Sequence, residues 1–182
     1  MRDTTEFVAE SLLTFNSVEY NPVQDYLVLE PSAGTGFLAN YIKYFFKERI
    51  MQSVENSLTI DCIELNKDKC DILSKDFPKA IHGDFLKLDI QRKYDLIIAA
   101  PPFKGNTDLE HIMKMYDLLK VGGEIISLTT PYWFTNNESL QVKFREWLSD
   151  KPHKIKMLPD MTFSERGKTV PTAIINIYKW RP

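Results

Sequence analysis

The sequence predicts an α/β fold in which a doubly wound, seven-stranded and mostly parallel sheet ends in an antiparallel strand pair. Three observations lead to this prediction. Short apolar runs alternate with amphipathic segments of helical spacing, the first run ends in an acid and a glycine-rich turn, and no helical segment separates the last two runs. Such an alternation is typical of helices packed on both faces of one sheet.

The expected elements follow one another with turn residues between them. Strands are expected over 26–30, 58–64, 79–82, 94–100, 124–130, 153–158 and 173–178. Helices are expected over 4–16, 37–50, 67–78, 107–120 and around 140–148. Asp3 and Glu6 have the spacing of a capping box, Asn66 is a candidate N-cap, and Gly122-Gly123 is expected to stop the fourth helix. The aromatic stretch 131–134 and the polar stretch 160–172 are expected to be loops.

Length and composition are those of one globular domain over residues 1–182. No run of 18 apolar residues occurs and Met1-Arg2-Asp3 opens no signal peptide, so we expect a cytoplasmic protein without a membrane segment. Cys62 and Cys70 fall in an expected strand and helix and read as buried free thiols. The three histidines and two cysteines lack ligand spacing, so no metal is expected.

The charge is distributed unevenly along the chain. The net charge is −2, which is not typical of a protein that binds DNA by itself. From Lys143 onward, however, nine Lys and Arg stand against four Asp and Glu, whereas the first 142 residues hold 14 basic and 21 acidic residues. The basic part is either a solvated surface or a surface that faces phosphate.

The stretch from Tyr26 to Ala39 predicts a nucleotide site. An apolar strand ends in Glu30, a turn of small residues follows, and an amphipathic helix begins. Gly34 and Gly36 let the backbone turn tightly and approach a ligand, and the helix N-terminus points free N–H groups into the same space. The stretch also fits the dinucleotide pattern G-x-G-x-x-A, but Glu30 would meet the pyrophosphate of NAD with a carboxylate.

The turn resembles the first motif of S-adenosylmethionine-dependent methyltransferases, in the E-P-x-x-G-x-G form of N6-adenine DNA methyltransferases. The resemblance implies a Rossmann-like class I methyltransferase fold and S-adenosylmethionine as the cofactor. It implies that Glu64, which ends the second strand, accepts both ribose hydroxyls, that Asp84 accepts the adenine amine, and that Phe85 packs on the adenine ring. The implied cofactor-binding residues are Glu30, Pro31, Ala33, Gly34, Gly36, Glu64, Asp84 and Phe85.

The segment Ala100-Pro101-Pro102-Phe103 closely resembles the (N/D/S)-P-P-(Y/F) motif of amino-group methyltransferases. In that family the Asn or Asp side chain and the carbonyl of the first proline accept the two hydrogens of the target amine, which turns its lone pair toward the methyl group. The target base must leave the duplex stack, and Phe103 would stack on it. The order of motifs, cofactor first and no target-recognition domain after them, is that of a DNA adenine-N6 methyltransferase of restriction-modification type.

Ala100 stands where that family has Asn or Asp, and a methyl group accepts no hydrogen bond. Losing one preorganised group of this kind costs about 10²- to 10³-fold in rate, so we expect this chain to be inactive or impaired. We favour an engineered replacement over natural decay, because decay would also blur the neighbouring cofactor motifs.

Contacts with the substrate are expected from the later part of the chain. Tyr132 follows the fifth strand, and the stretch with Phe163, Arg166 and Lys168 resembles the family's region that faces the flipped base. Because of the net charge, we expect weak DNA binding by this chain alone and a separate subunit or domain that recognises the sequence.

Other functions remain open at this level. RNA adenine and protein glutamine methyltransferases share the Pro-Pro-aromatic turn for the same amine chemistry. A non-catalytic module that binds S-adenosylmethionine and a partner would explain Ala100. An NAD-linked oxidoreductase is less favoured, because no Tyr-x-x-x-Lys constellation is present.

Overall fold

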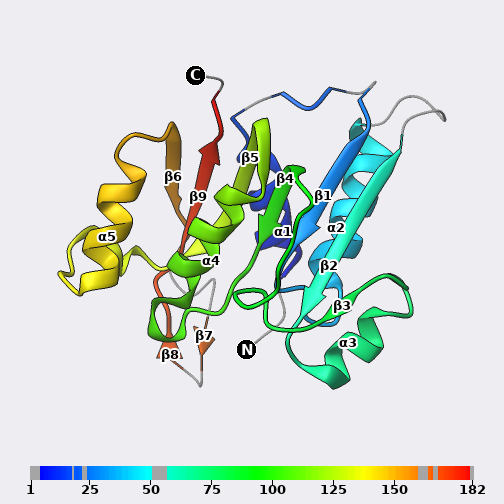
Figure 1. Ribbon diagram of the computed structural model, residues 1–182, viewed down its shortest axis with the longest axis horizontal. Coiled ribbons are helices and arrows are strands. Elements are labelled where there is room, and N and C mark those ends of the chain that lie inside the picture. The colour runs from blue at the N-terminus through cyan, green and yellow to red at the C-terminus, as the bar shows by residue number, and fades with distance from the viewer. Residues whose placement is uncertain are drawn as a thin grey trace.

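The computed structural model describes residues 5–17, 19–21, 24–50, 57–159, 164–165 and 168–180, and for the strands within 164–169 it describes the backbone alone. The main sheet has seven strands in the spatial order β3-β2-β1-β4-β5-β9-β6, and β7 and β8 form a separate pair (Figure 1). The strands are β1 (Tyr26–Glu30), β2 (Leu58–Glu64), β3 (Ile81–His82), β4 (Tyr94–Ala99), β5 (Leu119–Thr129), β6 (His153–Met157), β7 (Ser164–Glu165), β8 (Lys168–Thr169) and β9 (Ala173–Tyr178).

The pairing confirms the predicted doubly wound sheet. Strands β1, β2, β3, β4 and β5 pair in parallel, and β9 lies antiparallel between β5 and β6. The chain moves outward from β1 to β3 and then returns to place β4 on the other side of β1. The topological switch point therefore lies between β1 and β4, and ligands of open α/β sheets bind beyond the carboxyl ends of the strands at such a point.

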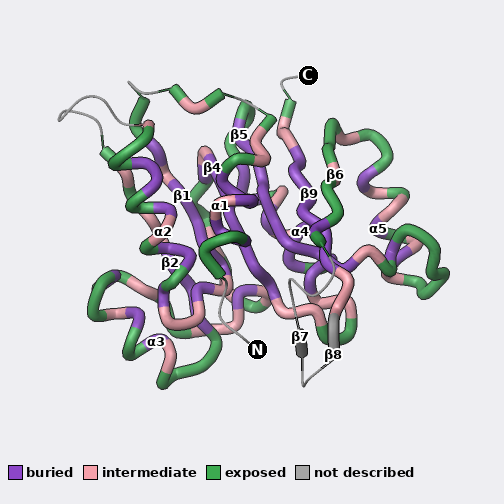
Figure 2. The backbone as a smooth tube through the Cα atoms, turned by 180° about the vertical axis from the view of Figure 1, so that it is seen from behind, coloured by how far each residue is buried: buried purple, intermediate pink, exposed green. Residues whose placement is uncertain are grey.

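Helices cover both faces of the sheet, so its central strands are buried on both sides (Figure 2). Side chains of β1, β4 and β5 alternate between two apolar clusters, one shared with α1 and α2 and the other with α4 and α5. Neighbouring residues such as Ile97 and Ile98 thus pack against opposite layers. The helices are α1 (Glu6–Thr14), α2 (Phe37–Phe45), the π-helical turn η1 (Phe46–Ile50), α3 (Lys67–Leu73), the 3₁₀ turn η2 (Lys104–Asn106), α4 (Thr107–Asp117), the 3₁₀ turn η3 (Pro131–Phe134) and α5 (Ser139–Leu148).

The prediction that Gly122-Gly123 stops the fourth helix is wrong. Helix α4 ends at Asp117, and both glycines lie inside β5, where the register with β4 shifts between Leu119 and Glu124. Gly122 has a φ of +87°, and a Cβ on Gly123 would lie 2.8 Å from the carbonyl oxygen of Asp95. The two glycines therefore form a bulge that brings two backbones together, as strand glycines often do.

Other boundaries also differ from the prediction. Asn66 caps α3 as expected, through its side chain and the N–H of Lys69, but α3 ends at Leu73. Thr5 occupies the N-cap position of α1 without a side-chain bond, and Asp3 lies outside the described residues. The stretch 131–134 is a 3₁₀ turn, the helix expected through residue 50 finishes as a π-helical turn, and 160–172 contains the pair β7–β8.

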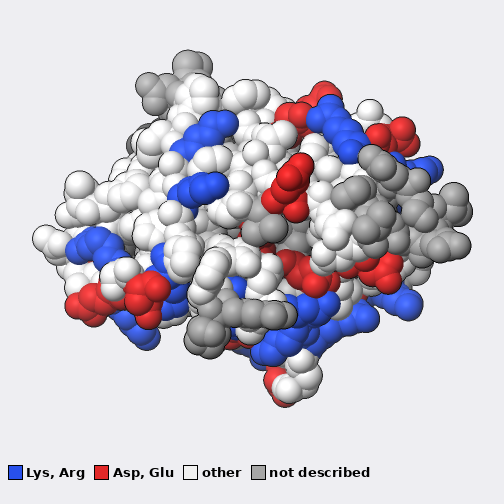
Figure 3. Space-filling model, turned by 90° about the horizontal axis from the view of Figure 1, so that it is seen from above, with Lys and Arg blue, Asp and Glu red and all other residues white. Residues whose placement is uncertain are grey.

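A hollow of about 250 Å³ opens at the amino ends of the parallel strands, opposite the switch point. Figure 3 views the molecule from that end and shows acidic side chains gathered near the middle of the face. Glu19, Asp95 and Glu124 line the hollow. Such a lining disfavours phosphate within the hollow. In the part of the chain that the structure describes, no helix is long and apolar enough to span a membrane.

Candidate functional site

The switch point brings together the two motifs that the sequence analysis singled out. Strands β1 and β4 pair in parallel, with Val28 beside Leu96 and Leu29 beside Ile97. The glycine turn leaves the carboxyl end of β1, and the Ala-Pro-Pro-Phe turn leaves the carboxyl end of β4. Residues 70 positions apart therefore meet at one edge of the sheet, where a bound molecule can contact both turns.

Gly34 and Gly36, the two glycines of the first turn, have different structural roles. Both need a left-handed backbone, with φ of +58° at Gly34 and +98° at Gly36. A Cβ built on Gly34 meets no atom within 4 Å, whereas one on Gly36 would lie 2.9 Å from Cδ1 of Leu73. Gly36 thus lets α3 pack against the turn, and Gly34 faces open space that can receive a ligand. Pro31 and Ala33, which lie beside them, are buried.

Glu64, at the end of β2, holds the glycine turn in place through hydrogen bonds to its backbone. One carboxylate oxygen accepts the N–H of Gly34 at 2.7 Å, and the other accepts the N–H of Asn66 at 2.7 Å. The side chain is buried at 9% exposure. Sequence reasoning placed Glu64 at this site but missed its bonds to the backbone. Each oxygen still has lone-pair capacity, so the ribose contact stays a prediction.

Glu30, at the end of β1, is buried, with 1% of its surface exposed. The backbone N–H of Ala39, in the first turn of α2, donates to its carboxyl group, while Oε2 has no hydrogen-bond partner among the residues that the structure describes. Burial raises the pKa of Glu30 to about 8, the Ala39 bond opposes the rise, and the nearby Glu64 adds to it. Since Glu30 already takes an N–H at the helix N-terminus, this turn is poorly suited to the pyrophosphate of a dinucleotide.

Asp84 and Phe85, the predicted adenine contacts, lie in the loop after β3. Oδ1 of Asp84 accepts the N–H of Leu86 at 3.0 Å, and Lys87 approaches Oδ2 at 3.1 Å. The bond from Lys87 holds the pKa of Asp84 below its ordinary value. Phe85 is 2% exposed and packs on His111 of α4, with ring centroids 5.2 Å apart. Its ring therefore belongs to the core here, which leaves little of it to cover a ligand.

Ala100, which follows β4, packs inward. It is 8% exposed and belongs to the cluster of α1 and α2, against which Phe103 also packs. Pro101 is buried, and Pro102 and Phe103 are half-buried. Ala100 contributes only a methyl group at this place.

Asp108 was missed by sequence reasoning. It lies in the first turn of α4 with no exposed surface, and its Oδ2 accepts the hydroxyl of Thr129 at 2.8 Å and the N–H of Thr130 at 3.0 Å. In the described part of the chain its Oδ1 has no hydrogen-bond partner, and burial raises the pKa of Asp108. The buried carboxyl ties the helix after the Pro-Pro-Phe turn to the end of β5. An acid in the first turn of that helix was the available signal.

The aromatic turn η3 follows β5 at the same edge. Tyr132 and Phe134 are exposed, whereas Trp133 is buried and stacks on Phe134 with centroids 4.2 Å apart. Arg145 of α5 donates to the carbonyl oxygens of Trp133, at 2.5 Å, and of Asn136, at 2.7 Å. A cation on α5 thus fixes the loop that presents the predicted substrate residue Tyr132.

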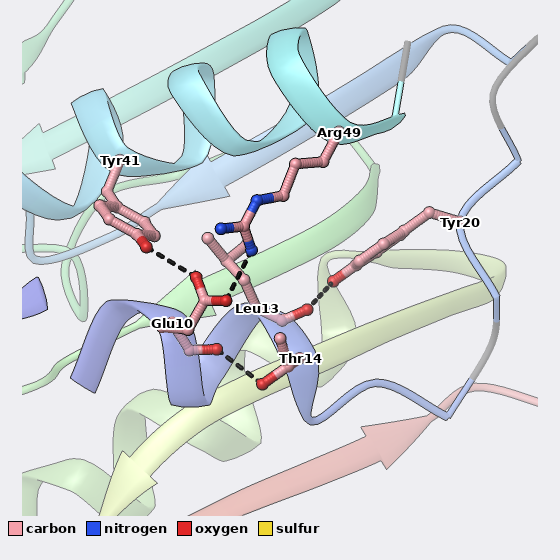
Figure 4. Close-up of polar contacts among 6 residues, drawn as sticks. All are labelled: Glu10, Leu13, Thr14, Tyr20, Tyr41 and Arg49. Atoms are coloured by element: carbon pink, nitrogen blue, oxygen red, sulfur yellow. Dashed lines mark hydrogen bonds and ion pairs between the residues drawn. The ribbon is translucent and has the colours of Figure 1, made fainter. Parts of the chain in front are cut away.

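Polar contacts join helix α1 to α2 and to the following turn η1 (Figure 4). Glu10 accepts the hydroxyl of Tyr41 at 2.6 Å through one oxygen and Arg49 at 2.6 Å through the other. The Tyr41 bond, followed by the Arg49 bond, lowers the pKa of Glu10, and the same bond raises the pKa of Tyr41 to about 12. Tyr20 donates to the carbonyl of Leu13 at 3.2 Å and holds the other end of α1.

The remaining predicted substrate residues are only partly placed. Phe163 and Arg166 lie outside the described residues, and Lys168 lies in β8, whose backbone alone is described. The β7–β8 pair lies beyond the carboxyl ends of the parallel strands (Figure 1). The segment is therefore on the correct side of the sheet for the expected contacts, which stay predictions.

No family model matches the chain. A curated relative, the malonyl-[acyl-carrier protein] O-methyltransferase of Priestia megaterium, is 34% identical over 107 residues, which are 58% of this chain and 37% of that protein. The matched part of the chain thus spans well under half of the relative's length.

Solved structures share the fold at low sequence identity. A chain of a type I restriction-modification system superposes with a TM-score of 0.79 at 16% identity, over 99% of this chain and 42% of that one. An rRNA methylase from Streptococcus thermophilus superposes with a TM-score of 0.59 at 13% identity, over 100% of this chain and 99% of that one. With its parallel core and antiparallel final pair, the chain has the Rossmann-like fold of the class I methyltransferases.

Proposed function

We propose that this chain is an S-adenosylmethionine-dependent methyltransferase core directed at an exocyclic amine, with N6 of adenine in DNA as the first candidate. The observation that carries the proposal is the meeting of the glycine turn and the Pro-Pro-Phe turn at the switch point between β1 and β4. One turn suits a nucleoside-containing cofactor and the other suits a planar amine, and the two lie side by side.

The residues present fit this cofactor. Gly34 faces open space, Glu64 has lone pairs beyond its two backbone bonds, and Oε2 of Glu30 is a buried acceptor without a partner. Glu30 would meet the cationic amino-acid end, Glu64 the ribose, and Asp84 the adenine amine. When bound, S-adenosylmethionine supplies a methyl group on a positively charged sulfur.

The chain's own contribution to the chemistry is to hold the amine. The carbonyl oxygen of Pro101 would accept one amine hydrogen, Phe103 would stack on the base, and the two prolines would keep the turn rigid. Ala100 accepts nothing, so the second amine hydrogen lacks its acceptor and the lone pair stays partly in the ring. This chain is expected to transfer methyl groups very slowly.

Similarity to a chain of a type I restriction-modification system supports DNA as the substrate and a separate recognition subunit. The rRNA methylase that the chain matches over nearly its whole length keeps RNA as an alternative. Lys154 and Lys156 are exposed on the edge strand β6 and would contact phosphate together with the segment that follows. Binding to duplex DNA is then weak, little dependent on sequence and steeply reduced by salt, which a titration at several salt concentrations measures.

Ala100 also favours a second candidate, a module that binds the cofactor and a partner without catalysis. Calorimetry with S-adenosylmethionine and with NAD tests the shared part, because binding of NAD alone would contradict both candidates. Methylation assays of Ala100→Asn on unmethylated DNA and RNA separate them. A rise of at least about 10²-fold supports the enzyme, whereas good cofactor binding without any methyl transfer supports the module.

A further inference from the structure

Glu30 is much more buried than a carboxyl group that only contacts a ligand at the surface would have to be. It is the last residue of β1, is 1% exposed, and lies under the first turn of α2, whose Ala39 N–H donates to its carboxyl group. The second oxygen, Oε2, is buried, and no described residue forms a hydrogen bond with it. An ionised carboxylate in such a place would leave half of its charge without compensation.

No cation acts on Glu30 among the residues that the structure describes. The titratable groups that do act on it are the carboxyl of Glu64 and the thiol of Cys62, both on β2, while α2 contributes the Ala39 N–H. A second carboxylate disfavours ionisation, and one neutral N–H only partly offsets burial, so the pKa of about 8 leaves Glu30 mostly protonated at pH 7.

We propose that Glu30 is a neutral acid in the empty protein and loses its proton when the ammonium group of the cofactor arrives, so that cofactor binding releases one proton. The inference rests on the proposed function, because it takes S-adenosylmethionine or its product as the ligand. The ammonium is already protonated at neutral pH, so the only proton that moves is the one that leaves the carboxyl group for the buffer. Glu30 thus becomes negatively charged only when a positive charge is present.

The arrangement separates two classes of ligand. A cation placed within about 4–6 Å favours the carboxylate and lowers its pKa, whereas a pyrophosphate would favour the neutral acid. A fragment of the cofactor without an amino-acid end offers no such cation and should leave the proton in place. The protonation state of Glu30 therefore depends on the charge of the ligand bound at the glycine turn.

Calorimetry on the whole chain at pH 7, in buffers of different ionisation enthalpy, counts the protons released. S-adenosylmethionine and S-adenosylhomocysteine should each release close to one proton at this pH, where the ammonium of the ligand is already protonated. Methylthioadenosine, which has the nucleoside and the sulfur but no ammonium, should release none. Glu30→Gln keeps the side-chain volume and an acceptor for the Ala39 N–H, and it should bind the cofactor more weakly with no release. Glu146→Gln, at an exposed carboxyl on α5, is the matched control and should behave like the unaltered chain.

Three outcomes would overturn the inference. Cofactor binding without proton release at pH 7 means that Glu30 does not ionise, and equal release with methylthioadenosine means that the ammonium is not the cause. Release that persists in Glu30→Gln assigns the proton to another group. The comparison of ligands uses the unaltered chain, so it stands even if Glu30→Gln fails to fold. If neither S-adenosylmethionine nor its product binds in any buffer, the proposed function itself fails, which is a distinguishable result.

Discussion

Replacing Glu64 should destabilise the empty protein, in addition to any effect on a ligand. The carboxylate accepts two backbone N–H groups at 2.7 Å each, one from Gly34 and one from Asn66. A hydrogen bond to a charged group contributes about 1.5–3 kcal/mol. Water can reach the open side of Gly34 and compensate part of the loss, so Glu64→Ala should lower the free energy of unfolding by about 2–4 kcal/mol.

A chain of 182 residues has an unfolding entropy of about 0.4 kcal/mol/K, so this loss corresponds to a fall in Tm of about 5–10 °C. Glu64→Gln keeps one acceptor oxygen but places an amide N–H against the other backbone donor, and it should lose about half as much. Glu146→Gln, at an exposed carboxyl on α5, should change the stability by less than about 0.5 kcal/mol. Thermal and urea unfolding of the empty protein measure all three variants. If Glu64→Ala melts within a degree of the unaltered chain, the hydrogen bonds from Gly34 and Asn66 to Glu64 contribute no stability.

Three further perturbations test other parts of the site. Ala100→Asn inserts a polar side chain into a packed cluster, so it should cost about 1–3 kcal/mol of stability by urea unfolding, and no measurable cost would show that the side chain turns outward. Asp108→Ala leaves the N–H of Thr130 unpaired and should lower the free energy of unfolding by about 1–3 kcal/mol. Asp108→Asn keeps the acceptor and should change the free energy of unfolding little at pH 7. Because the pKa of Asp108 is raised in the folded protein, ionisation of Asp108 lowers stability as the pH rises above 3.8, the ordinary pKa of the carboxyl. Asp108→Asn should remove this contribution to the dependence of the unfolding free energy on pH. An unchanged dependence would show that Asp108 does not titrate in this range. Arg145→Met frees the carbonyls of Trp133 and Asn136, so hydrogen exchange should quicken over 131–137, and unchanged exchange would refute its anchoring role.

Much of the architecture could be predicted from local patterns. Strands β1 and β2 begin and end where the apolar runs predict, because a buried parallel strand needs a continuous apolar stretch and ends where turn residues begin. The glycine turn could be recognised because only glycine adopts the left-handed backbone of Gly34 and Gly36 without strain. The two turns at the switch point could be expected to meet, since carboxyl ends of parallel strands share one edge.

Residue spacing did not reveal how the side chains of the site are partnered. The bulge at Gly122-Gly123 depends on the approach of Asp95 from β4 and on β9 at the other side, so a local pattern read it as the end of a helix. The burial of Phe85 depends on α4, which follows more than 20 residues later in the chain. Glu30 and Glu64 are both acids at strand ends, yet their surroundings differ. Among the described residues, Oε2 of Glu30 has no hydrogen-bond partner, whereas Glu64 accepts two backbone N–H groups. The sequence by itself determined the succession of strands and helices along the chain, the glycine turn and the residue types that meet, because these follow from local geometry and periodicity. The spatial order of the strands, with β9 between β5 and β6, came from the structure. Only the tertiary structure decided which carboxyl groups are charged and which side chains face a ligand, because burial and long-range partners set both.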